Sequence, residues 1–455
     1  MRKSHLFGLS LPGLILVFLL DAGAVNQRAG FIFDDLPVIV LNPQLRSPSF
    51  LEAMSFNPFR ATAYATFWAQ IRSIHGRELG AGDAGIFRFV NLVLHWLAGM
   101  ALAGLGLRLF PARKYLPVAA AYLFWLNPVF LEAQNLVLGR TEIMATIFYL
   151  LALGFYLGRK RPGLSRLGFF IALILALFSK ETAATLPAAA LLLSLYKSER
   201  PKKPELIAGS VIVIIAIILR LAWPIELARS PRLVPAWPEY FLAQNWILWL
   251  GAVKTIFPLH LNFDYQLEFG NSMGIVFLLS NLAALAAIVF VALRKWNTGF
   301  LVLVWPLLYL PLMAVPLADN FRESRLYLSS AWLILLVSLV FSVALSKRKI
   351  LSGIGLAAVL VCFILLGFAR AQTWSSGESL WKDAVTKSPK KFRPLFNYGN
   401  ALRRKLELDR AKRAYLWAKS LEPDNLEVDR NLFLLEQAQK NPALIQKLKS
   451  QLSEP

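Results

Sequence analysis

Cysteine, histidine and acidic residues are scarce in this 455-residue chain. Cys362 is the single cysteine, which excludes an intramolecular disulfide and a metal site built from several thiolates. The four histidines are too scattered for a zinc motif. The 27 acidic residues are outnumbered by 49 lysines and arginines, for a formal net charge of +22. These basic residues form short clusters between apolar runs rather than a patch interleaved with aromatics, so they indicate membrane topology and no nucleic-acid partner.

Charged residues of either sign are too few for a soluble domain. They make up 17% of the chain against 57% hydrophobic residues, and the mean hydropathy is +0.53. This composition predicts an all-α fold, a polytopic membrane helix bundle. The eleven candidate helices are 6–24, 86–107, 116–135, 141–158, 167–179, 182–196, 205–222, 272–293, 299–317, 327–346 and 350–369.

The basic clusters predict how these segments thread the membrane. They are Arg2/Lys3, Arg108/Arg113/Lys114, Arg159/Lys160/Arg161/Arg166, Lys197/Arg200/Lys202/Lys203, Arg294/Lys295 and Lys347/Arg348/Lys349. If all are cytoplasmic by the positive-inside rule, the chain crosses about eleven times with its N-terminus in the cytoplasm. Residues 1–24 also resemble a signal peptide, and we interpret them as an uncleaved span. Segment 237–265 must then not cross, and Lys254 and Pro258 within it favour an interfacial or re-entrant helix.

Two domains are predicted. Residues 1–370 form the membrane domain, with a long first outer loop at 25–85, and residues 371–455 form a helical tail. Ser375 and Glu378 are spaced as a capping box that opens the tail. Pro389 and Pro423 are separated by the 34-residue period of tetratricopeptide repeats. Because such repeats need about three copies to bury a core and only about two fit here, we expect the tail to dock on the membrane domain or on a partner.

The predicted outer turns combine acids, bases and aromatics, whereas the cytoplasmic loops hold almost only lysine and arginine. These outer residues are Asp34, Asp35, Arg60, Arg88, Asn91, His95, Glu132, Arg140, Glu142, Lys180, Glu181, His260, Asp264, Tyr265, Glu323, Arg325 and Tyr327. A charge at bilayer depth costs about 2.5 to 3.5 kcal/mol, so it is normally paired or functional. Two plainer interpretations stay open. The charged residues can be ions at helix ends, and Asn91 and His95 can form an interhelical hydrogen bond.

This pattern suits a reaction between a lipid-linked phosphate and a polar acceptor. A carboxylate of Asp34 or Asp35 can take the proton of an acceptor hydroxyl as general base. Guanidinium and ammonium groups can hold the phosphate as it leaves. The adjacent carboxylates can instead bind a divalent cation through oxygen ligands. No cofactor other than that cation is indicated.

The ordered motifs resemble a family over essentially the whole chain. They are Phe33-Asp34-Asp35, Arg88-x-x-Asn91-x-x-x-His95, Asn127-Pro128-x-x-x-Glu132-Ala133, Gly139-Arg140-x-Glu142, Ser179-Lys180-Glu181-Thr182, Asp264-Tyr265 and Glu323-x-Arg325-x-Tyr327-Leu328. Followed by tetratricopeptide repeats, this set resembles the transmembrane-and-tetratricopeptide O-mannosyltransferases and their bacterial relatives. These are glycosyltransferases of the GT-C class that use polyprenyl-phosphate sugars.

The resemblance implies an inverting glycosyltransferase of GT-C type, with mannose as the first expected sugar. By this resemblance the acidic pair Asp34 and Asp35 supplies the catalytic base, and Arg140, Lys180 and Arg325 bind the donor phosphate. The other outer residues named above would line the substrate pocket. Arg88 and Asn127 stand where the family more often has histidine.

The expected partners are a polyprenyl-phosphate sugar donor, membrane lipids and a protein or glycan acceptor, which the repeat tail would present. We expect a bacterial inner membrane location with the active face and the repeats on the non-cytoplasmic side. The alternative is a non-catalytic membrane scaffold whose repeats recruit a partner protein. A transporter is disfavoured because the ionisable residues gather at one face rather than at mid-span.

Overall fold

The computed structural model describes residues 3–21, 30–74, 79–158, 160–223, 235–267, 271–294 and 298–440. Within these ranges all regular secondary structure is helical, and no strand is present. Six helical segments are long and apolar enough to cross a membrane. They are α6 (Ala84–Leu109), η5 with α9 (Val137–Gly139 and Arg140–Tyr156), α12 (Lys203–Ala222), α14 (Asn271–Leu293), η7 with α16 (Glu323–Leu326 and Tyr327–Lys347) and α17 (Lys349–Thr373). The predicted all-α polytopic bundle is therefore confirmed.

A seventh predicted segment, 116–135, is broken rather than continuous. Helix α7 (Leu116–Trp125) is followed by η4 (Pro128–Phe130) and α8 (Leu131–Asn135) at a bend of 51°. Pro128 lacks a backbone N–H and cannot continue the helix. The Asn127 side chain accepts from Val129 N at 3.0 Å and starts the new turn. The break matters for the site because it brings Glu132 to the end of the bundle.

Four shorter apolar helices occupy the remaining predicted segments. They are α1 (Lys3–Leu20), α10 (Pro162–Leu177), α11 (Leu186–Tyr196), which follows η6 (Glu181–Thr185), and α15 (Thr298–Ala314). By length and composition the described residues contain six spans, or seven with the bent pair. The total of eleven crossings stays a prediction.

Helix α13 (Trp237–Ile256) covers the segment that was expected not to cross. At its first residue, Trp237 Nε1 donates to Ala314 O at the last residue of α15. Near its last turn, Thr255 O accepts from Asn127 Nδ2 at 2.8 Å, at the break between α7 and η4. Both ends of α13 thus contact the ends of neighbouring helices at the side where the acidic and basic residues gather. These contacts fit an interfacial helix, and the absence of a crossing stays a prediction.

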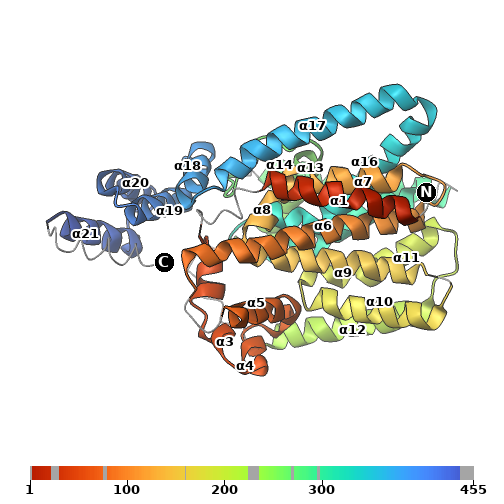
Figure 1. Ribbon diagram of the computed structural model, residues 1–455, viewed down its shortest axis with the longest axis horizontal. Coiled ribbons are helices and arrows are strands. Elements are labelled where there is room, and N and C mark those ends of the chain that lie inside the picture. The colour runs from red at the N-terminus through yellow and green to blue at the C-terminus, as the bar shows by residue number, and fades with distance from the viewer. Residues whose placement is uncertain are drawn as a thin grey trace.

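The long first outer loop is itself folded into short helices. They are η1 (Leu36–Val40), α3 (Pro43–Arg46), α4 (Phe50–Ser55), η2 (Pro58–Arg60), α5 (Ala61–Ser73) and η3 (Ala81–Asp83). Leu45 and Phe67 are fully buried in a core that continues into Phe87 of α6. Trp68 Nε1 donates to Ser47 O at 2.9 Å and connects α5 to the end of α3. The loop is a compact cap on one end of the bundle (Figure 1).

The tail consists of α18 (Gly377–Lys387), α19 (Phe392–Arg404), α20 (Leu408–Leu421) and α21 (Leu426–Lys440). These helices extend beyond the same end of the bundle as the first-loop helices (Figure 1). The capping box that opens α18 pairs Ser376 with Ser379, so its prediction at Ser375 and Glu378 was wrong by one residue. The Ser379 hydroxyl accepts from the Ser376 N–H and so completes the capping box, whereas Glu378 pairs with Lys405. The assignment of these helices to tetratricopeptide repeats stays a prediction.

Candidate active site

The two adjacent carboxylates of the first loop face different partners. Asp35 is fully buried and accepts from the backbone N–H groups of Val137 at 3.1 Å and Leu138 at 2.9 Å. Burial raises the pKa of Asp35 to about 6, although these N–H groups lower it. The Asp34 side chain is 39% exposed, and its Oδ2 lies 3.1 Å from Arg322 Nη1. Asp34 is therefore the accessible carboxylate, and Asp35 anchors the loop to the turn before α9.

Arg322 connects Asp34 to the bundle. Its Nε donates to Glu132 Oε1 at 3.0 Å, and Glu132 also accepts from Glu323 N and from the Ser324 hydroxyl. Three donors thus satisfy the fully buried Glu132 carboxylate. Arg322 Nη2 is buried and has no hydrogen-bond partner among the described residues. Arg322 holds Asp34 in place, and its two Nη2–H groups donate to no described residue.

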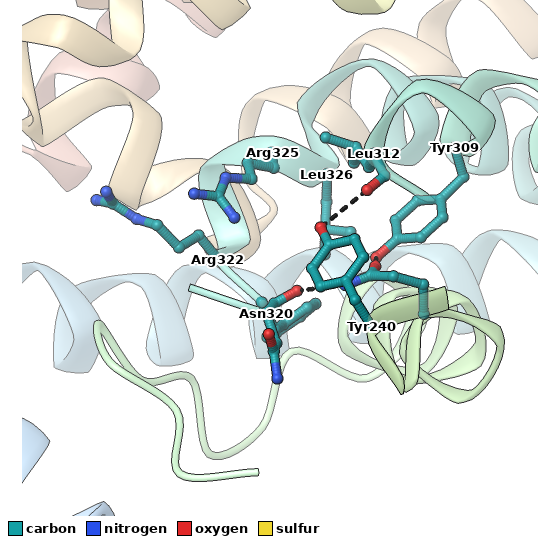
Figure 2. A pocket seen from close by; sticks show the side chains of 9 residues that line it. Tyr240, Tyr309, Leu312, Asn320, Arg322, Arg325 and Leu326 are labelled. Carbon is teal, nitrogen blue, oxygen red and sulfur yellow. Dashed lines mark hydrogen bonds between the residues drawn. The ribbon is translucent and has the colours of Figure 1, made fainter. Parts of the chain in front are cut away.

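Figure 2 shows Arg322 and Arg325 extending to the same side, away from Tyr240 and Tyr309. A small cavity of about 10 Å³ beside them has room for about one water. Arg325 Nη1 donates to Asp319 O, so this predicted phosphate contact is already bound to backbone.

Phe33 sets the direction of Asp34. Its φ is +53°, in the left-handed region that a bulky residue rarely adopts. Four neighbours hold the ring: the aromatic rings of Phe263 and Trp381, and the guanidinium groups of Arg322 and Arg393 at 5.3 and 5.2 Å from its centroid. Strained backbone of this kind persists only where its surroundings over-determine it. Trp381 and Arg393 belong to the tail, so the tail helps to hold the turn that presents Asp34.

Ion pairs join the tail to the bundle beside Phe33. Arg393 pairs with both Asp264 and Asp319, and Lys391 also pairs with Asp264. Burial raises the pKa of Asp319, but the cations of Arg393 and Arg322 outweigh this and hold it well below its usual range. The expected docking of the tail on the membrane domain is confirmed by these contacts.

Glu323 forms a second junction between the bundle and the tail. Its Oε1 accepts from the Tyr265 hydroxyl at 2.6 Å, and its Oε2 lies 3.3 Å from Arg370 Nη2. Arg370 reaches on to Asp383 in α18 at 3.1 Å. Glu323 and Tyr265 therefore support the structure of the site rather than lining an open pocket. His260 is exposed, has a φ of +52° and lies on the neighbouring loop.

A second group of predicted residues lies where the first loop contacts the turn between α10 and η6. Lys180 Nζ lies 2.8 Å from Glu142 Oε1, and Arg60 Nη2 lies 3.5 Å from Glu181 Oε2. Tyr64 connects this group to Asp34 electrostatically. Burial raises the pKa of Tyr64, the Arg60 cation lowers it and the Asp34 carboxylate raises it. Arg60 and Asp34 thus both lie near the Tyr64 phenol, and Arg60 in turn faces Glu181 beside Lys180.

Five predicted site residues are buried inside the bundle instead: Arg88, Asn91, His95, Arg140 and Tyr327. Arg140 is fully buried and donates to Asn91 Oδ1, Thr66 Oγ1 and Phe87 O at 2.8 to 2.9 Å. Protein groups therefore occupy its guanidinium, and we correct its predicted phosphate contact to a structural role. The others are Arg88, which donates to Asn135 O, Asn91, which also donates to Leu136 O, and His95, whose Nδ1 lies 2.6 Å from the Tyr327 hydroxyl. The plainer interpretation of an interhelical hydrogen bond holds for Asn91 and for His95.

Several residues of this site were not predicted. Arg322 and Asp319 belong to the predicted outer turn but had no assigned role, and nothing in their spacing distinguishes them from helix-end ions. Arg370 is the last residue of the predicted membrane domain, and Arg393 lies in the first part of the tail, where a basic residue looks like ordinary repeat surface. Lys391 and Arg393 lie two and four residues after Pro389, and this short basic run is a signal that could have pointed to them.

An all-helical bundle with a polar end, where acids and bases meet beneath a folded cap and a helical tail, defines a multi-pass membrane protein. The chain is 25% identical over 409 residues to "Protein O-mannosyl-transferase F38B6.6" of Caenorhabditis elegans, which covers 82% of this chain and 57% of that protein. It is 22% identical over 466 residues to human "Protein O-mannosyl-transferase TMTC3", covering 89% of this chain and 50% of that protein. A third relative, Drosophila melanogaster "Protein O-mannosyl-transferase Tmtc1", is 30% identical over 184 residues, or 37% of this chain and 21% of that protein.

The resemblance to the transmembrane-and-tetratricopeptide O-mannosyltransferases is thereby confirmed. The chain spans about half the length of the first two of these curated relatives. No family model matches the chain, and no solved structure matches it.

Proposed function

We propose that this chain is a membrane glycosyltransferase that transfers a sugar, with mannose the first candidate, from a polyprenyl-phosphate carrier to an acceptor hydroxyl. The observation that carries the proposal is Asp34. It is an accessible carboxylate on a strained turn, held by Arg322 at the end of the bundle where the polar residues gather. The names of the relatives support a sugar transfer and a protein acceptor in general terms.

In the proposed step Asp34 is the general base. Its carboxylate takes the proton of the acceptor hydroxyl as the hydroxyl oxygen attacks the anomeric carbon. The bond from this carbon to the phosphate oxygen breaks, and the electron pair leaves with the polyprenyl phosphate. A single displacement inverts the anomeric configuration. Arg322 fixes the position of Asp34, because its Nε is held in turn by the buried Glu132.

Cations near Asp34 would bind the departing phosphate. Lys180 and Arg60 lie in the second group, and each already faces a carboxylate, Glu142 or Glu181. Arg322 Nη2 has no hydrogen-bond partner among the described residues, and the same guanidinium contacts Asp34, so it is a third candidate donor. Charge-assisted bonds from such groups stabilise the negative charge that grows on the leaving oxygen. We assign the phosphate to Lys180, Arg60 and Arg322, and no longer to Arg140.

A divalent cation held by Asp34 and Asp35 together does not fit this geometry. The Asp35 carboxylate accepts from three backbone N–H groups, while Asp34 faces Arg322. No group of three or more histidine, cysteine or acidic side chains that could hold a metal ion is found in the described part of the chain. We derive no step through a metal.

The proposed active face is non-cytoplasmic. Basic residues with backbone partners collect at the other end of the helices: Lys197 donates to Leu109 O at 3.1 Å and Lys202 to Gly158 O at 3.0 Å. This distribution agrees with the positive-inside rule. A bacterial inner membrane remains the proposed location.

The test is release of polyprenyl phosphate by the purified chain from radiolabelled mannosyl, glucosyl and aminoarabinosyl lipid donors. We expect release with one donor, and loss of release in Asp34→Asn. If no donor of this panel is turned over in the presence of peptide or glycan acceptors, the scaffold function would take its place. That alternative predicts that replacing Asp34 and Lys180 leaves the biological function intact.

A further inference from the structure

A cavity separates the turn that carries Asp34 from the first helices of the tail. It holds about 180 Å³ of free space. Phe33 and Leu36 of the first loop form one wall, and Trp381 of α18 with Asn400 and Arg404 of α19 forms the other. This volume lies below the about 300 to 1,000 Å³ of usual cofactor and drug sites, so it suits a short stretch of chain rather than a large ligand.

The polar groups on the tail wall match a peptide unit. Asn397 Nδ2 donates to Arg393 O at 3.0 Å, and Asn400 Oδ1 accepts from the Tyr415 hydroxyl at 2.7 Å. Among the residues that the structure describes, the Asn397 oxygen and the Asn400 nitrogen have no hydrogen-bond partner. One acceptor and one donor three residues apart on a helix lie on the same face. Each backbone unit of an extended peptide offers one donor and one acceptor to such a pair.

Charge gives the cavity a preference. Arg404 is exposed at its edge, and no carboxylate lies within ion-pair distance of it in the described part of the chain. Neighbouring cations of the tail differ, since Lys405 and Arg410 both pair with Glu378. An acidic side chain on the bound segment would meet the unpaired Arg404.

The cavity also lies close to the proposed base. Phe33 is next to Asp34 and Leu36 is two residues away, so their Cα atoms lie within about 3.8 and 7.6 Å of the Cα of Asp34. A chain held against these two residues passes the turn on which the carboxylate sits. The other wall belongs to the tail, which ion pairs fix to the bundle through Arg393.

We infer that this cavity is the acceptor site, and that it binds an extended polypeptide segment with an acidic side chain near the hydroxyl to be modified. The inference rests on the proposed transferase function. Asn397 and Asn400 bind the main chain, Arg404 binds the acidic side chain, and the rings of Phe33 and Trp381 pack against the segment.

The test measures binding of short fluorescent peptides to the full chain in phosphatidylcholine nanodiscs. Each peptide carries one threonine flanked by glutamates, glutamines or lysines. We expect the glutamate peptide to bind most tightly and the lysine peptide most weakly, with a preference that shrinks at high salt. Arg404→Glu should weaken binding of the glutamate peptide about fivefold or more, since removing one partly exposed ion pair costs up to about fivefold and reversal adds repulsion.

Gly377 provides a second variant that blocks the cavity by volume. It lines the cavity at the start of α18, and a Cβ at this position meets no atom within 4 Å. Gly377→Leu therefore fits without steric conflict and should weaken peptide binding about tenfold or more, as expected when a side chain occupies the site. Gly163→Leu is the matched control, because Gly163 also starts a helix and faces open space. Arg413→Glu, at an exposed position of α20, is the control for charge.

Wild-type binding in both cavity variants, or no binding of any peptide to the wild-type chain, would overturn the inference. Weakening by the two control variants as strongly as by the cavity variants would overturn it as well. Glycosylation of the peptide is a second measurement, which separates failure of the acceptor site from failure of the proposed function. If the wild-type chain glycosylates the peptide and Gly377→Leu leaves the peptide KM unchanged, the acceptor site is wrong and the transferase stands. If no donor is turned over, the transferase fails while the binding result still decides the cavity.

Discussion

Replacing Asp34 and Asp35 one at a time separates the base from the anchor. Asp34→Asn removes the proposed base, so we expect transfer to fall by about 10² to 10⁴-fold, the usual contribution of a general base. Stability should change by less than about 1 kcal/mol, because the Asp34 side chain is 39% exposed and such pairs contribute little. Arg322 keeps Glu132 as its partner in this variant.

Asp35→Asn should act on stability instead. Three backbone N–H groups, of Ile32, Val137 and Leu138, donate to the two carboxylate oxygens. An asparagine side chain offers one acceptor oxygen and one NH₂ group, so at least one amide is left unsatisfied at a cost of about 1 to 3 kcal/mol. An opposing effect comes from the pKa of about 6. Because the ordinary pKa of an aspartate is 3.8, ionisation of this buried carboxyl costs about 3 kcal/mol at neutral pH.

The two effects on Asp35 differ in their pH dependence. Because its folded pKa is raised, the wild-type chain binds the proton more tightly when folded, and its stability falls as the pH rises from about 4 to about 6. The asparagine variant lacks this change. We therefore expect the stability difference, variant minus wild type, to move in favour of the variant by up to about 3 kcal/mol across that window and to stay constant above it.

Two assays compare the variants. Thermal unfolding in detergent as a function of pH measures stability, and release of polyprenyl phosphate from the lipid donor measures activity. Full activity in Asp34→Asn would refute the assignment of the base. Loss of activity in Asp35→Asn, with an unchanged unfolding profile at every pH, would show that Asp35 does chemistry rather than anchoring the loop.

Three further predictions concern the groups around this turn. Glu132→Gln should lower stability by about 3 kcal/mol, since it leaves the buried Arg322 charge without its main partner. The control Glu205→Gln, in the partly exposed pair with Arg166, should cost less than about 1 kcal/mol. Thermal unfolding compares the two variants, and equal effects would contradict the argument. Arg393→Ala should release the tail, seen as faster tryptic cleavage after residue 370, and unchanged cleavage would refute the docking contacts. Docking of the wild-type tail should not vary between pH 8 and pH 5, because the pKa of Asp319 is held well below its usual range. The stability that the Asp319 ion pair contributes is present above the pKa of Asp319 in the unfolded chain and is lost only as the pH falls further. Cleavage by proteases active at each pH measures docking, and release of the tail by pH 5 would contradict the prediction.

The helices of the membrane domain could be predicted because hydropathy is a local property. Each apolar segment of the sequence coincides with helical structure, which is continuous in all of them except 116–135. The break at Pro128 was missed although proline is a strong local signal, because the segment 116–135 is apolar on both sides of it. The capping box at α18 was displaced by one residue because serines at 375, 376 and 379 offer overlapping choices.

The roles of single site residues could not be predicted, since they depend on contacts between distant parts of the chain. Asp34 and Asp35 are neighbours in sequence, yet the positive φ of Phe33 and the amides of Val137 and Leu138 send them to different partners. In the same way Arg140 looks like a free cation after a glycine. It is enclosed because α5 and α6 fold over it and supply Thr66 and Phe87.

Both the bundle and the tail contact the Phe33 ring, so both affect the backbone turn that presents Asp34. A chain of charges runs from Glu132 through Arg322 to the ring, and a second runs from Asp264 through Arg393 to the same ring. Removing the whole tail would therefore disturb the turn of Asp34 as well as any acceptor site, and lost activity in a truncated chain would not distinguish the two. Substitutions at the cavity wall, which leave both chains of charge intact, can make that distinction.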